Sequence, residues 1–466
     1  MKMTKNITEG NIYKNLLLYA IPLILSSLLS HAYSTVDGII AGKCVGEYAL
    51  GAISATGSFD TLFSQLISGF VAGFSIYISH LFGKGSFRQI KENVVSVTTF
   101  ISIFALSVSL LTIIFRAPIL DYLKVDPIIR TEAERYFVVY TAGYVIYHVN
   151  SVIIHVLHAL GVTSFSLYTS ILSAVLNIAG NLFTVLVLDM GVTGLALSTL
   201  LSAAVGTVIY VFILYRAFKE LPSEPASYRL RLSALTSSLR YTIPASVQLL
   251  AFHGITFLIA PSINVLGAAA STGYNVANRL YSFGTIGLWS TTNAFSCYIG
   301  QSVGEGSPAK IQKGLRCGFI LNILTLAPSM LLICLLADPV SSIFFPAGYT
   351  GKAFVYATRY AKIFLPFVYV QLIGHVLHAY MRSLGRFSVV LGVTIVGSLT
   401  RLACTFWLVP LLGMDGVFIG QIFGWGIDAA VSVLLCVLLY RTNKQLIKVI
   451  ELAHEKKRAS HTAKTS

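Results

Sequence analysis

The chain has 466 residues, of which 55% are hydrophobic and 11% charged, and its mean hydropathy is +0.77. This composition leaves too few polar side chains to cover a soluble globule of that length, so it excludes a soluble domain and indicates a polytopic membrane protein. The net charge of +15 would suit nucleic acid, but the basic residues lie mainly between apolar runs, so we expect no nucleic-acid partner.

Apolar runs long enough to cross a membrane recur along the whole chain. A helix of roughly 20 residues spans about 30 Å of hydrocarbon. The runs therefore predict an all-α fold with twelve transmembrane helices. The predicted spans are residues 15–40, 57–82, 93–115, 133–160, 165–188, 192–217, 239–262, 279–303, 316–337, 358–383, 388–412 and 414–440.

Short motifs in the first half of the chain return in the second half at a nearly constant spacing. Pro22 and Pro244 are 222 positions apart (244 − 22 = 222), and other pairs of motifs differ by nearly the same number. A duplicated six-helix unit places both copies in the same orientation, because six is an even number of spans. We predict two parallel six-helix bundles related by a pseudo-two-fold (6+6) repeat, an architecture typical of transporters.

The repeat also predicts the domain organisation. The expected parts are an N-terminal six-helix lobe (1–216), a cytoplasmic linker (217–238), a C-terminal six-helix lobe (239–440) and a basic cytoplasmic tail (441–466).

Basic residues gather in alternate loops. Lys84 and Arg88 follow the second predicted span, Arg231 and Arg240 lie near the central loop, and Arg382 lies at the turn between the tenth and eleventh spans. The positive-inside rule then places both termini in the cytoplasm of a multi-pass cell-membrane protein. We expect a monomer surrounded by membrane lipid.

The energy source is expected to be an ion gradient. A pump driven by ATP needs a phosphate-binding GxxxxGK[ST] loop, and the sequence contains none. No cofactor is expected, and the coupling ion would be H⁺ or Na⁺.

Polar residues within the predicted spans mark the candidate ion site. A carboxylate at the centre of a membrane helix costs about 2.5 to 3.5 kcal/mol on insertion scales, so Asp37 in the first span indicates function. Tyr33 lies one helical turn before it, Asn177 and Asn181 are one turn apart in the fifth span, and Thr199 lies at a similar depth in the sixth. We predict that these five residues form one ion-coupling cluster.

Several motifs resemble those of the multidrug and toxic compound extrusion (MATE) transporter family. They are Tyr-Ser-Thr-Val-Asp-Gly-Ile-Ile-Ala-Gly ending at Gly42, Ala-Val-Leu-Asn-Ile around Asn177, the stretch from Gly191 to Thr199, Ala-Asn-Arg ending at Arg279, and Met-Arg-Ser-Leu-Gly ending at Gly385. The resemblance implies a 6+6 fold with a central cleft, and a secondary active antiporter that exports organic cations, including xenobiotics. It also implies that Asp37, Asn177 and Thr199 belong to the cation site of the N-terminal lobe.

Two positions depart from the pattern of that family. Its members commonly carry a second acid in the fifth helix, where this chain has Asn181, and some carry an acid in the seventh helix, where this chain has Phe252. A sodium site in the C-terminal lobe is therefore not expected, and Asp37 is left as the principal coupling residue.

The coupling ion is left open between two alternatives. A carboxyl group in a water-poor cleft can be neutral with a proton and charged when it faces a cationic substrate, so proton and drug would compete for Asp37. Sodium bound by oxygens of Asp37, Asn177, Asn181 and Thr199 is the alternative, but a single carboxylate makes a weak site for a hard cation. We favour protons and expect no resident metal ion.

Other polar residues within the spans have candidate roles. Aromatic rings bind flat organic cations, so Tyr144, Tyr147, Gln248, Tyr369 and Gln371 are candidates to line the substrate cleft; the alternative is that they pack between helices.

Arg401 and Asp428 lie at similar depths in the eleventh and twelfth spans. We expect a structural ion pair between them rather than a second ion site at Asp428.

Two other functions are weighed against transport of organic cations. His148, His155, His158, His375 and His378 suggest a membrane enzyme with a histidine-bound metal, but no acid accompanies them in their helices. The other alternative is a lipid-linked sugar flippase of the wider superfamily. Such a protein needs a cationic cleft for phosphate, whereas the positive charges here are expected mostly at the cytoplasmic edge.

Overall fold

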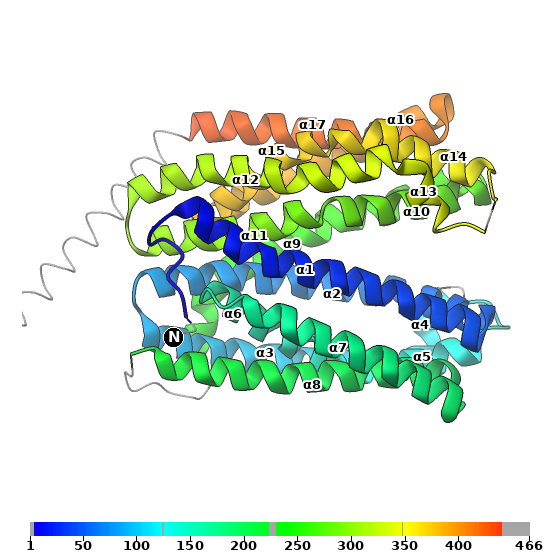
Figure 1. The fold of residues 1–466 in the computed structure, drawn as a ribbon, viewed down its shortest axis with the longest axis horizontal. Coiled ribbons are helices and arrows are strands. Elements are labelled where there is room, and N and C mark those ends of the chain that lie inside the picture. The colour runs from blue at the N-terminus through cyan, green and yellow to red at the C-terminus, as the bar shows by residue number, and fades with distance from the viewer. Residues whose placement is uncertain (1–3, 124, 223–229, 347, 440–466) are drawn as a thin grey trace, which may run out of the picture. The chain divides into compact units, whose positions relative to one another are not determined.

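The structure, a computed structural model, describes residues 4–123, 125–222, 230–346 and 348–439. The chain divides into two compact units, which we call the N-terminal and C-terminal lobes (Figure 1). The N-terminal lobe comprises Met1–Asn6 and Ile21–Thr242, and the C-terminal lobe comprises Ile7–Ala20 and Ile243–Ser466.

The helices of the N-terminal lobe follow the chain in order. They are α1 (Ile12–Ile40), whose first residues belong to the C-terminal lobe, α2 (Glu47–Gly83), α3 (Phe87–Ile114), α4 (Arg116–Tyr122), α5 (Arg130–Ala142), α6 (Tyr144–Ala159), α7 (Ser164–Leu182) and α8 (Gly191–Glu220). Short π-helical turns, Ala41–Val45 and Phe183–Val187, extend α1 and α7.

The C-terminal lobe repeats this series. Its helices are α9 (Leu232–Asn264), which begins within the N-terminal lobe, α10 (Ala268–Gly284), α11 (Ile286–Gly304), α12 (Pro308–Leu335), α13 (Ala337–Ser342), α14 (Lys352–Arg359), α15 (Val368–Ser383), α16 (Phe387–Leu412) and α17 (Met414–Leu438).

The lobe boundaries differ from the predicted ones at the N-terminus. Residues 7–20 were predicted in the first lobe but belong to the second. The N–H of Ile7 donates a hydrogen bond to Oε1 of Gln301 at 3.0 Å, and Nζ of Lys310 donates to Oγ1 of Thr8 at 2.9 Å. These contacts join the start of the chain to α11 and α12, a long-range pairing that hydropathy does not reveal.

The predicted linker is helical at both ends. Helix α8 continues to Glu220 and α9 begins at Leu232, so both enter the range 217–238. Residues 223–229 of the linker and the predicted tail 441–466 lie outside the described residues.

The duplication is visible in the element boundaries. Helix α2 runs from Glu47 to Gly83, and α10 with α11 runs from Ala268 to Gly304, which is the same range shifted by 221 residues (268 − 47 and 304 − 83). The difference between the copies is a break at Thr285, where the second copy divides into two helices.

Twelve transmembrane helices in two six-helix lobes make up the fold. Among the described residues, ten helices are long and apolar enough to cross a membrane, and α5 with α6, bent by 44°, forms an eleventh. The repeat identifies α10 with α11, the counterpart of α2, as the twelfth. Almost all of α11 is buried within its lobe, so it needs little apolar surface of its own toward lipid.

Three predicted spans are not single helices. The span 133–160 bends at Gly143, and the range 279–303 contains the break at Thr285. The span 358–383 is divided by a π-helical turn and a short 3₁₀ turn around Pro366. Proline lacks a backbone N–H and clashes with the preceding helical turn, which explains the last of these breaks.

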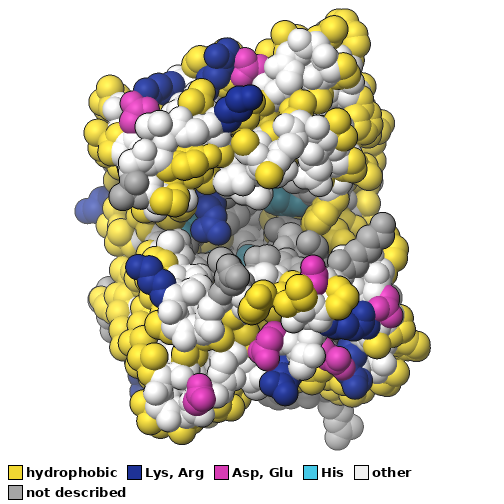
Figure 2. Space-filling model, turned by 90° about the vertical axis from the view of Figure 1, so that its right-hand side faces the viewer, with side chains coloured by type: hydrophobic (Ala, Val, Ile, Leu, Met, Phe, Trp, Pro, Cys, Tyr) yellow, Lys and Arg dark blue, Asp and Glu magenta, His cyan; other side chains and the backbone are white. Residues whose placement is uncertain are grey.

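The lateral surface is apolar and the helix ends carry charges. Large hydrophobic side chains are exposed along α3, α8, α12 and α17, as expected for a surface that contacts lipid. Figure 2 shows hydrophobic side chains along the flanks and both basic and acidic side chains on the face toward the viewer. In the N-terminal lobe Arg116 pairs with Glu134, and in the C-terminal lobe Lys362 pairs with Asp338.

Candidate functional site

A carboxylate on α1 meets two asparagines of α7 in the N-terminal lobe. Nδ2 of Asn181 donates a hydrogen bond to Oδ1 of Asp37 at 2.6 Å. The amide of Asn177 is best satisfied with its nitrogen toward the same carboxylate, where it donates to Oδ1 at 2.7 Å and accepts from Oγ1 of Thr199 at 3.2 Å. The structure thus brings together residues from three helices. They are Asp37 of α1, Asn177 and Asn181, which are one helical turn apart on α7, and Thr199 of α8.

Apolar packing close to these polar groups fixes their positions. Ile40, Ala41, Val185 and Leu195 form a buried cluster that joins the ends of α1 and α7 to α8. Asp37, Asn181 and Thr199 each lie within about one helical turn of this cluster along the chain, and Asn177 lies about two turns from it. The π-helical turns Ala41–Val45 and Phe183–Val187 begin just after Asp37 and Asn181, and such turns are frequent at functional sites.

The two asparagines are almost fully enclosed. Asn177 is 2% exposed and Asn181 1% exposed, whereas Asp37 is half-buried. Enclosing an amide without hydrogen bonds is costly, so the bonds to Asp37 and Thr199 are needed to keep both side chains inside the lobe.

A polar cavity of about 350 Å³ lies beside this cluster. Tyr33, Tyr147, Asn177 and Thr199 are among its lining residues, together with Tyr140 from α5. None of the described residues that line this cavity is a lysine or an arginine. Its size is at the lower end of the range of pockets that bind small organic molecules.

Sequence analysis missed a second carboxylate in the same lobe. Asp60 on α2 accepts hydrogen bonds from Oγ of Ser64 and from the hydroxyl of Tyr140, both at 3.4 Å. Sequence analysis could have identified Asp60, because this acid lies three residues inside the predicted span 57–82. The Tyr140 ring lies 5.2 Å from the Tyr147 ring, so Asp60 borders the aromatic wall of the cavity.

Tyr144 and His148, by contrast, pack in the lobe interior. Tyr144 is fully buried, and its ring lies 4.9 Å from the ring of Phe63. His148 meets the same phenylalanine edge-on at 4.8 Å. Tyr144 was a candidate cleft residue, and it is not among the residues that line the 350 Å³ cavity.

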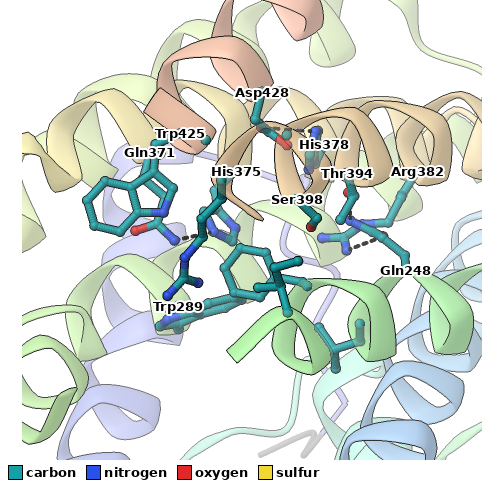
Figure 3. A pocket seen from close by; sticks show the side chains of 16 residues that line it. Gln248, Trp289, Gln371, His375, His378, Arg382, Thr394, Ser398, Trp425 and Asp428 are labelled. Atoms are coloured by element: carbon teal, nitrogen blue, oxygen red, sulfur yellow. Dashed lines mark hydrogen bonds and ion pairs between the residues drawn. The ribbon is translucent and has the colours of Figure 1, made fainter. Parts of the chain in front are cut away.

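The C-terminal lobe has a pocket of its own, which we call the C-lobe pocket (Figure 3). Two predicted cleft residues line it. Gln248 on α9 donates to Oγ1 of Thr394 and accepts from Arg382, both at 3.1 Å. Nε2 of Gln371 on α15 lies 2.7 Å from the hydroxyl of Tyr281 and 3.0 Å from Nε2 of His375. Tyr369, also on α15, lines neither this pocket nor the N-terminal-lobe cavity.

The predicted ion pair between Arg401 and Asp428 is wrong in this structure. Both residues line the C-lobe pocket, but Asp428 lies 3.4 Å from Nε2 of His378, and Arg401 donates to the hydroxyl of Tyr274 at 3.2 Å. Matching depths along two helices do not determine the direction in which their side chains point.

Glycines on two helices make room for Asp428. A Cβ at Gly374 would collide with Oδ1 of Asp428, and a Cβ at Gly397 would lie 2.9 Å from its Cβ. The carboxylate therefore occupies a niche between α15 and α16, beside His378.

The histidines form pairs but no metal cluster. His155 bonds to the backbone oxygen of Ser151 and His158 to Oγ of Ser166, both at 2.8 Å. Within the described part of the chain, no group of three His, Cys, Asp or Glu side chains is arranged to hold a metal ion.

Comparison with known families finds two matching models. The MatE model matches residues 22–183 and 244–407, that is, both halves of the chain. The model of the lipid II flippase MurJ matches residues 130–258.

Relatives and solved structures are similar over most of the chain. A probable multidrug resistance protein of Bacillus subtilis, YoeA, is 25% identical over 73% of this chain and 75% of its own length. A probable multidrug resistance protein of Idiomarina loihiensis, NorM, is 24% identical over 91% of this chain and 93% of its own. A MOP superfamily transporter from Pyrococcus furiosus has the same fold, with a TM-score of 0.86, 19% identity, and coverage of 97% of this chain and 100% of that one.

Proposed function

Since the chain belongs to the MatE family, we propose that it is a secondary active multidrug efflux antiporter that exports organic cations in exchange for an inorganic cation. Its relatives from B. subtilis and I. loihiensis carry the name of multidrug resistance proteins, which supports this substrate class. We assign the protein to transport rather than to catalysis.

The observation that carries the proposal is the arrangement around Asp37. Its carboxylate is half-buried, accepts a 2.6 Å hydrogen bond from Asn181, and lies beside a cavity whose described lining residues include no lysine or arginine. A negative group at this place can hold either an inorganic cation or the positive charge of a substrate. Competition between the two for Asp37 would couple their movements.

We favour the proton as the coupling ion. In the arrangement above, the amide nitrogens of Asn177 and Asn181 face the carboxylate. Sodium is bound by oxygens, so a sodium site here would require both amides to turn and present their carbonyl oxygens to the ion. A proton requires no such rearrangement, because it binds to the carboxylate itself.

Ion gradients of ordinary size provide enough free energy for export. One pH unit is worth about 1.4 kcal/mol for each proton exchanged. A membrane potential of 100 mV adds about 2.3 kcal/mol for each net charge moved. In a one-for-one exchange of a proton for a monovalent cation no net charge moves, so the pH gradient alone drives export, and two pH units, about 2.7 kcal/mol, support a concentration ratio of roughly a hundredfold.

The cavity beside Asp37 is the proposed place for the organic cation. Tyr33, Tyr140 and Tyr147 contribute aromatic rings to its lining, and rings of this kind attract cations by about 0.5 to 2 kcal/mol each. Asp60 behind Tyr140 adds a second negative group to the same wall.

The two alternatives have less support. The flippase model matches residues 130–258 only, whereas the MatE model matches most of both repeats. A metal-dependent enzyme needs a cluster of ligands, and the described residues offer none. We retain the expectation of a monomer in the cell membrane with both termini in the cytoplasm and no nucleic-acid partner.

Transport by the purified protein in lipid vesicles tests the proposal and the identity of the ion. The vesicles are loaded with a fluorescent organic cation such as ethidium, and a proton gradient and a sodium gradient are imposed separately. We expect ethidium movement to follow the proton gradient and to collapse with a protonophore. Movement that follows sodium and ignores the proton gradient would contradict the choice of ion, and movement with neither would contradict antiport.

A further inference from the structure

A carboxylate inside the C-terminal lobe has no permanent counterion. Asp428 on α17 lies in its niche between α15 and α16, with 20% of its side chain accessible. Among the described residues, no lysine or arginine lies within ion-pair distance of it, and none donates a hydrogen bond to it. Its close polar contact is with Nε2 of His378 on α15, at 3.4 Å. Since the predicted pair with Arg401 does not form, the role of Asp428 must be sought in the contact with His378.

A single proton makes the pair of Asp428 and His378 neutral overall. An unaccompanied carboxylate ion inside a membrane protein is costly. A neutral carboxyl beside a neutral imidazole avoids that cost, and so does a carboxylate beside an imidazolium. Both arrangements hold the same proton, on a carboxylate oxygen of Asp428 or on Nε2 of His378, so the proton belongs to the pair. His378 is 5% exposed, and its Nε2 has no hydrogen-bond partner within the described ranges, so the imidazole is available for this role.

Two arginines lie near the pair without neutralising it. Arg382 lies one helical turn beyond His378 on α15, and Arg401 lies one turn beyond Gly397 on α16. Both guanidiniums are held by hydrogen bonds to neutral groups, and Figure 3 shows the contact of Asp428 with His378 apart from Arg382. Positive charges at this distance favour release of a proton from the carboxyl, but they do not keep it permanently charged as a direct salt bridge would. The pair can therefore both hold and release its proton.

The other charged and titratable groups around Asp428 have partners or positions of their own. On the surrounding elements these groups are His375, His378 and Arg382 of α15, Arg401 of α16, His253 of α9, Tyr274 and Tyr281 of α10, and Tyr360 and Lys362 of the π-helical turn Tyr360–Phe364. His253 and Tyr360 interact electrostatically with Arg401, and on α17 itself Asp415 pairs with Arg359 at 2.7 Å. In the part of the chain that the structure describes, His378 is thus the group placed to share a proton with Asp428.

Water can reach the pair through the C-lobe pocket, which both residues line. The pocket has a volume of about 50 Å³. One water molecule needs about 10 to 15 Å³ and two to four polar partners. Gln371, Thr394 and Ser398 add amide and hydroxyl groups to the lining, so the pocket suits a few water molecules. A proton can leave the pair to such a water molecule and return from it.

We propose that the pair of Asp428 and His378 is a second proton-binding site, which takes up and releases one proton in each transport cycle. The inference rests on the proton antiport proposed above and extends it. With one proton at Asp37 and one at this pair, two protons enter for each monovalent organic cation that leaves. One net positive charge then moves inward in each cycle, so the membrane potential drives export together with the pH gradient.

The response of transport to a membrane potential tests this proposal. Full-length protein is reconstituted in vesicles with equal pH and equal sodium on both sides, and a potassium gradient with valinomycin makes the interior negative. A one-for-one exchange of proton and ethidium moves no net charge and ignores the potential. An exchange of two protons moves ethidium outward, whereas leakage of this cation moves it inward. For the wild type we expect an outward ethidium gradient of about tenfold at about 60 mV.

Asp428→Asn and His378→Gln should each abolish this response. The first variant removes the carboxyl, and the second removes the base that accompanies its charged form, so that Asp428 stays protonated. Both should still export ethidium with the pH gradient through Asp37. At one pH unit and zero potential, we expect about tenfold accumulation in each variant and about a hundredfold in the wild type. If Asp428→Asn does not fold, as judged by gel filtration, His378→Gln provides the test.

Asp415→Asn is the matched control. Asp415 is an acid on the same helix, but it pairs with Arg359 and is not among the pocket residues, so the variant should keep the response to the potential.

Three results would overturn the proposal while leaving the antiport intact. They are wild-type export that follows the pH gradient and ignores the potential, a full response to the potential in Asp428→Asn or His378→Gln, and an equal loss of the response in Asp415→Asn. Wild-type protein that moves no ethidium under a pH gradient would contradict the proposed antiport, and the second proton site with it. The two proposals therefore fail in distinguishable ways.

Discussion

Asn181 donates a 2.6 Å hydrogen bond to Asp37, although the two residues are 144 positions apart in the sequence. The bond joins α7 to α1 at the only carboxylate that sequence analysis assigned to ion coupling. The bond also determines which group of Asn181 lies next to an ion bound at Asp37, because its amide nitrogen, and not its oxygen, faces the carboxylate.

Replacing Asn181 with aspartate is expected to change the coupling ion. Asn181→Asp exchanges the N–H donor for a second carboxylate, and two carboxylates with the oxygens of Asn177 and Thr199 form a site that suits sodium. We expect ethidium transport in vesicles to acquire a dependence on the sodium gradient.

Asn150→Asp is the control for that change. Asn150 lines the same cavity but donates to Thr207 at 2.9 Å, so a new acid there adds negative charge away from Asp37. A sodium response in Asn150→Asp, or none in Asn181→Asp, would argue against the assignment of the ion site to the Asp37 cluster.

The hydrogen bond between Asp37 and Asn181 should also be measurable as a coupling energy. Thermal unfolding of Asp37→Ala, Asn181→Ala and the double variant in detergent forms a double-mutant cycle. We expect a coupling of about 0.6 to 1.7 kcal/mol, which are the average and the maximum for hydrogen bonds between membrane helices. A coupling indistinguishable from zero would mean that the two residues do not stabilise each other.

Exchanging the charges of Arg401 and Asp428 should not restore function. The two residues contact Tyr274 and His378 respectively and do not pair with each other. We expect Arg401→Asp, Asp428→Arg and the double exchange all to lower the yield of folded protein, with the double variant no better than the worse single variant. Recovery of folded protein in the double variant, measured by gel filtration, would instead support a direct pair.

Two tyrosines provide a test of the substrate cavity. Tyr147 lines the cavity beside Asp37, whereas Tyr369 lines neither described pocket. Losing one cation–π contact costs about 0.5 to 2 kcal/mol, so Tyr147→Leu should raise the KM for ethidium by roughly two- to thirtyfold. Tyr369→Leu should leave it near the wild-type value. A larger rise in the KM for ethidium in Tyr369→Leu than in Tyr147→Leu would indicate that ethidium binds outside this cavity.

Much of the fold could be predicted from the sequence, because hydropathy and the repeat both act along the chain. The copies of α2 and of α10 with α11 start and end at the same shift of 221 residues, as the repeated motifs indicated. The break at Thr285 was not predictable in this way, since the apolar run continues through it. The position of residues 7–20 depends on contacts with Gln301 and Lys310, which lie far away in the sequence.

The candidate site was predictable to the extent that helical spacing constrains it. Asp37, Asn177, Asn181 and Thr199 could be grouped because their depths agree and the asparagines share one face of α7. Depth alone could not provide the direction of each side chain around its helix. Because of the directions of their side chains, Asp428 contacts His378 and not Arg401, and Arg382 points into the C-lobe pocket.

The most direct test of the central claim is ethidium export driven by a proton gradient in vesicles that contain either the wild type or Asp37→Asn. The variant keeps the size of the side chain and removes the group that exchanges a proton. We predict that wild-type protein concentrates ethidium against its gradient and that Asp37→Asn, reconstituted in equal amount, does not. Export by Asp37→Asn at the wild-type rate would contradict the role of Asp37 as the coupling residue.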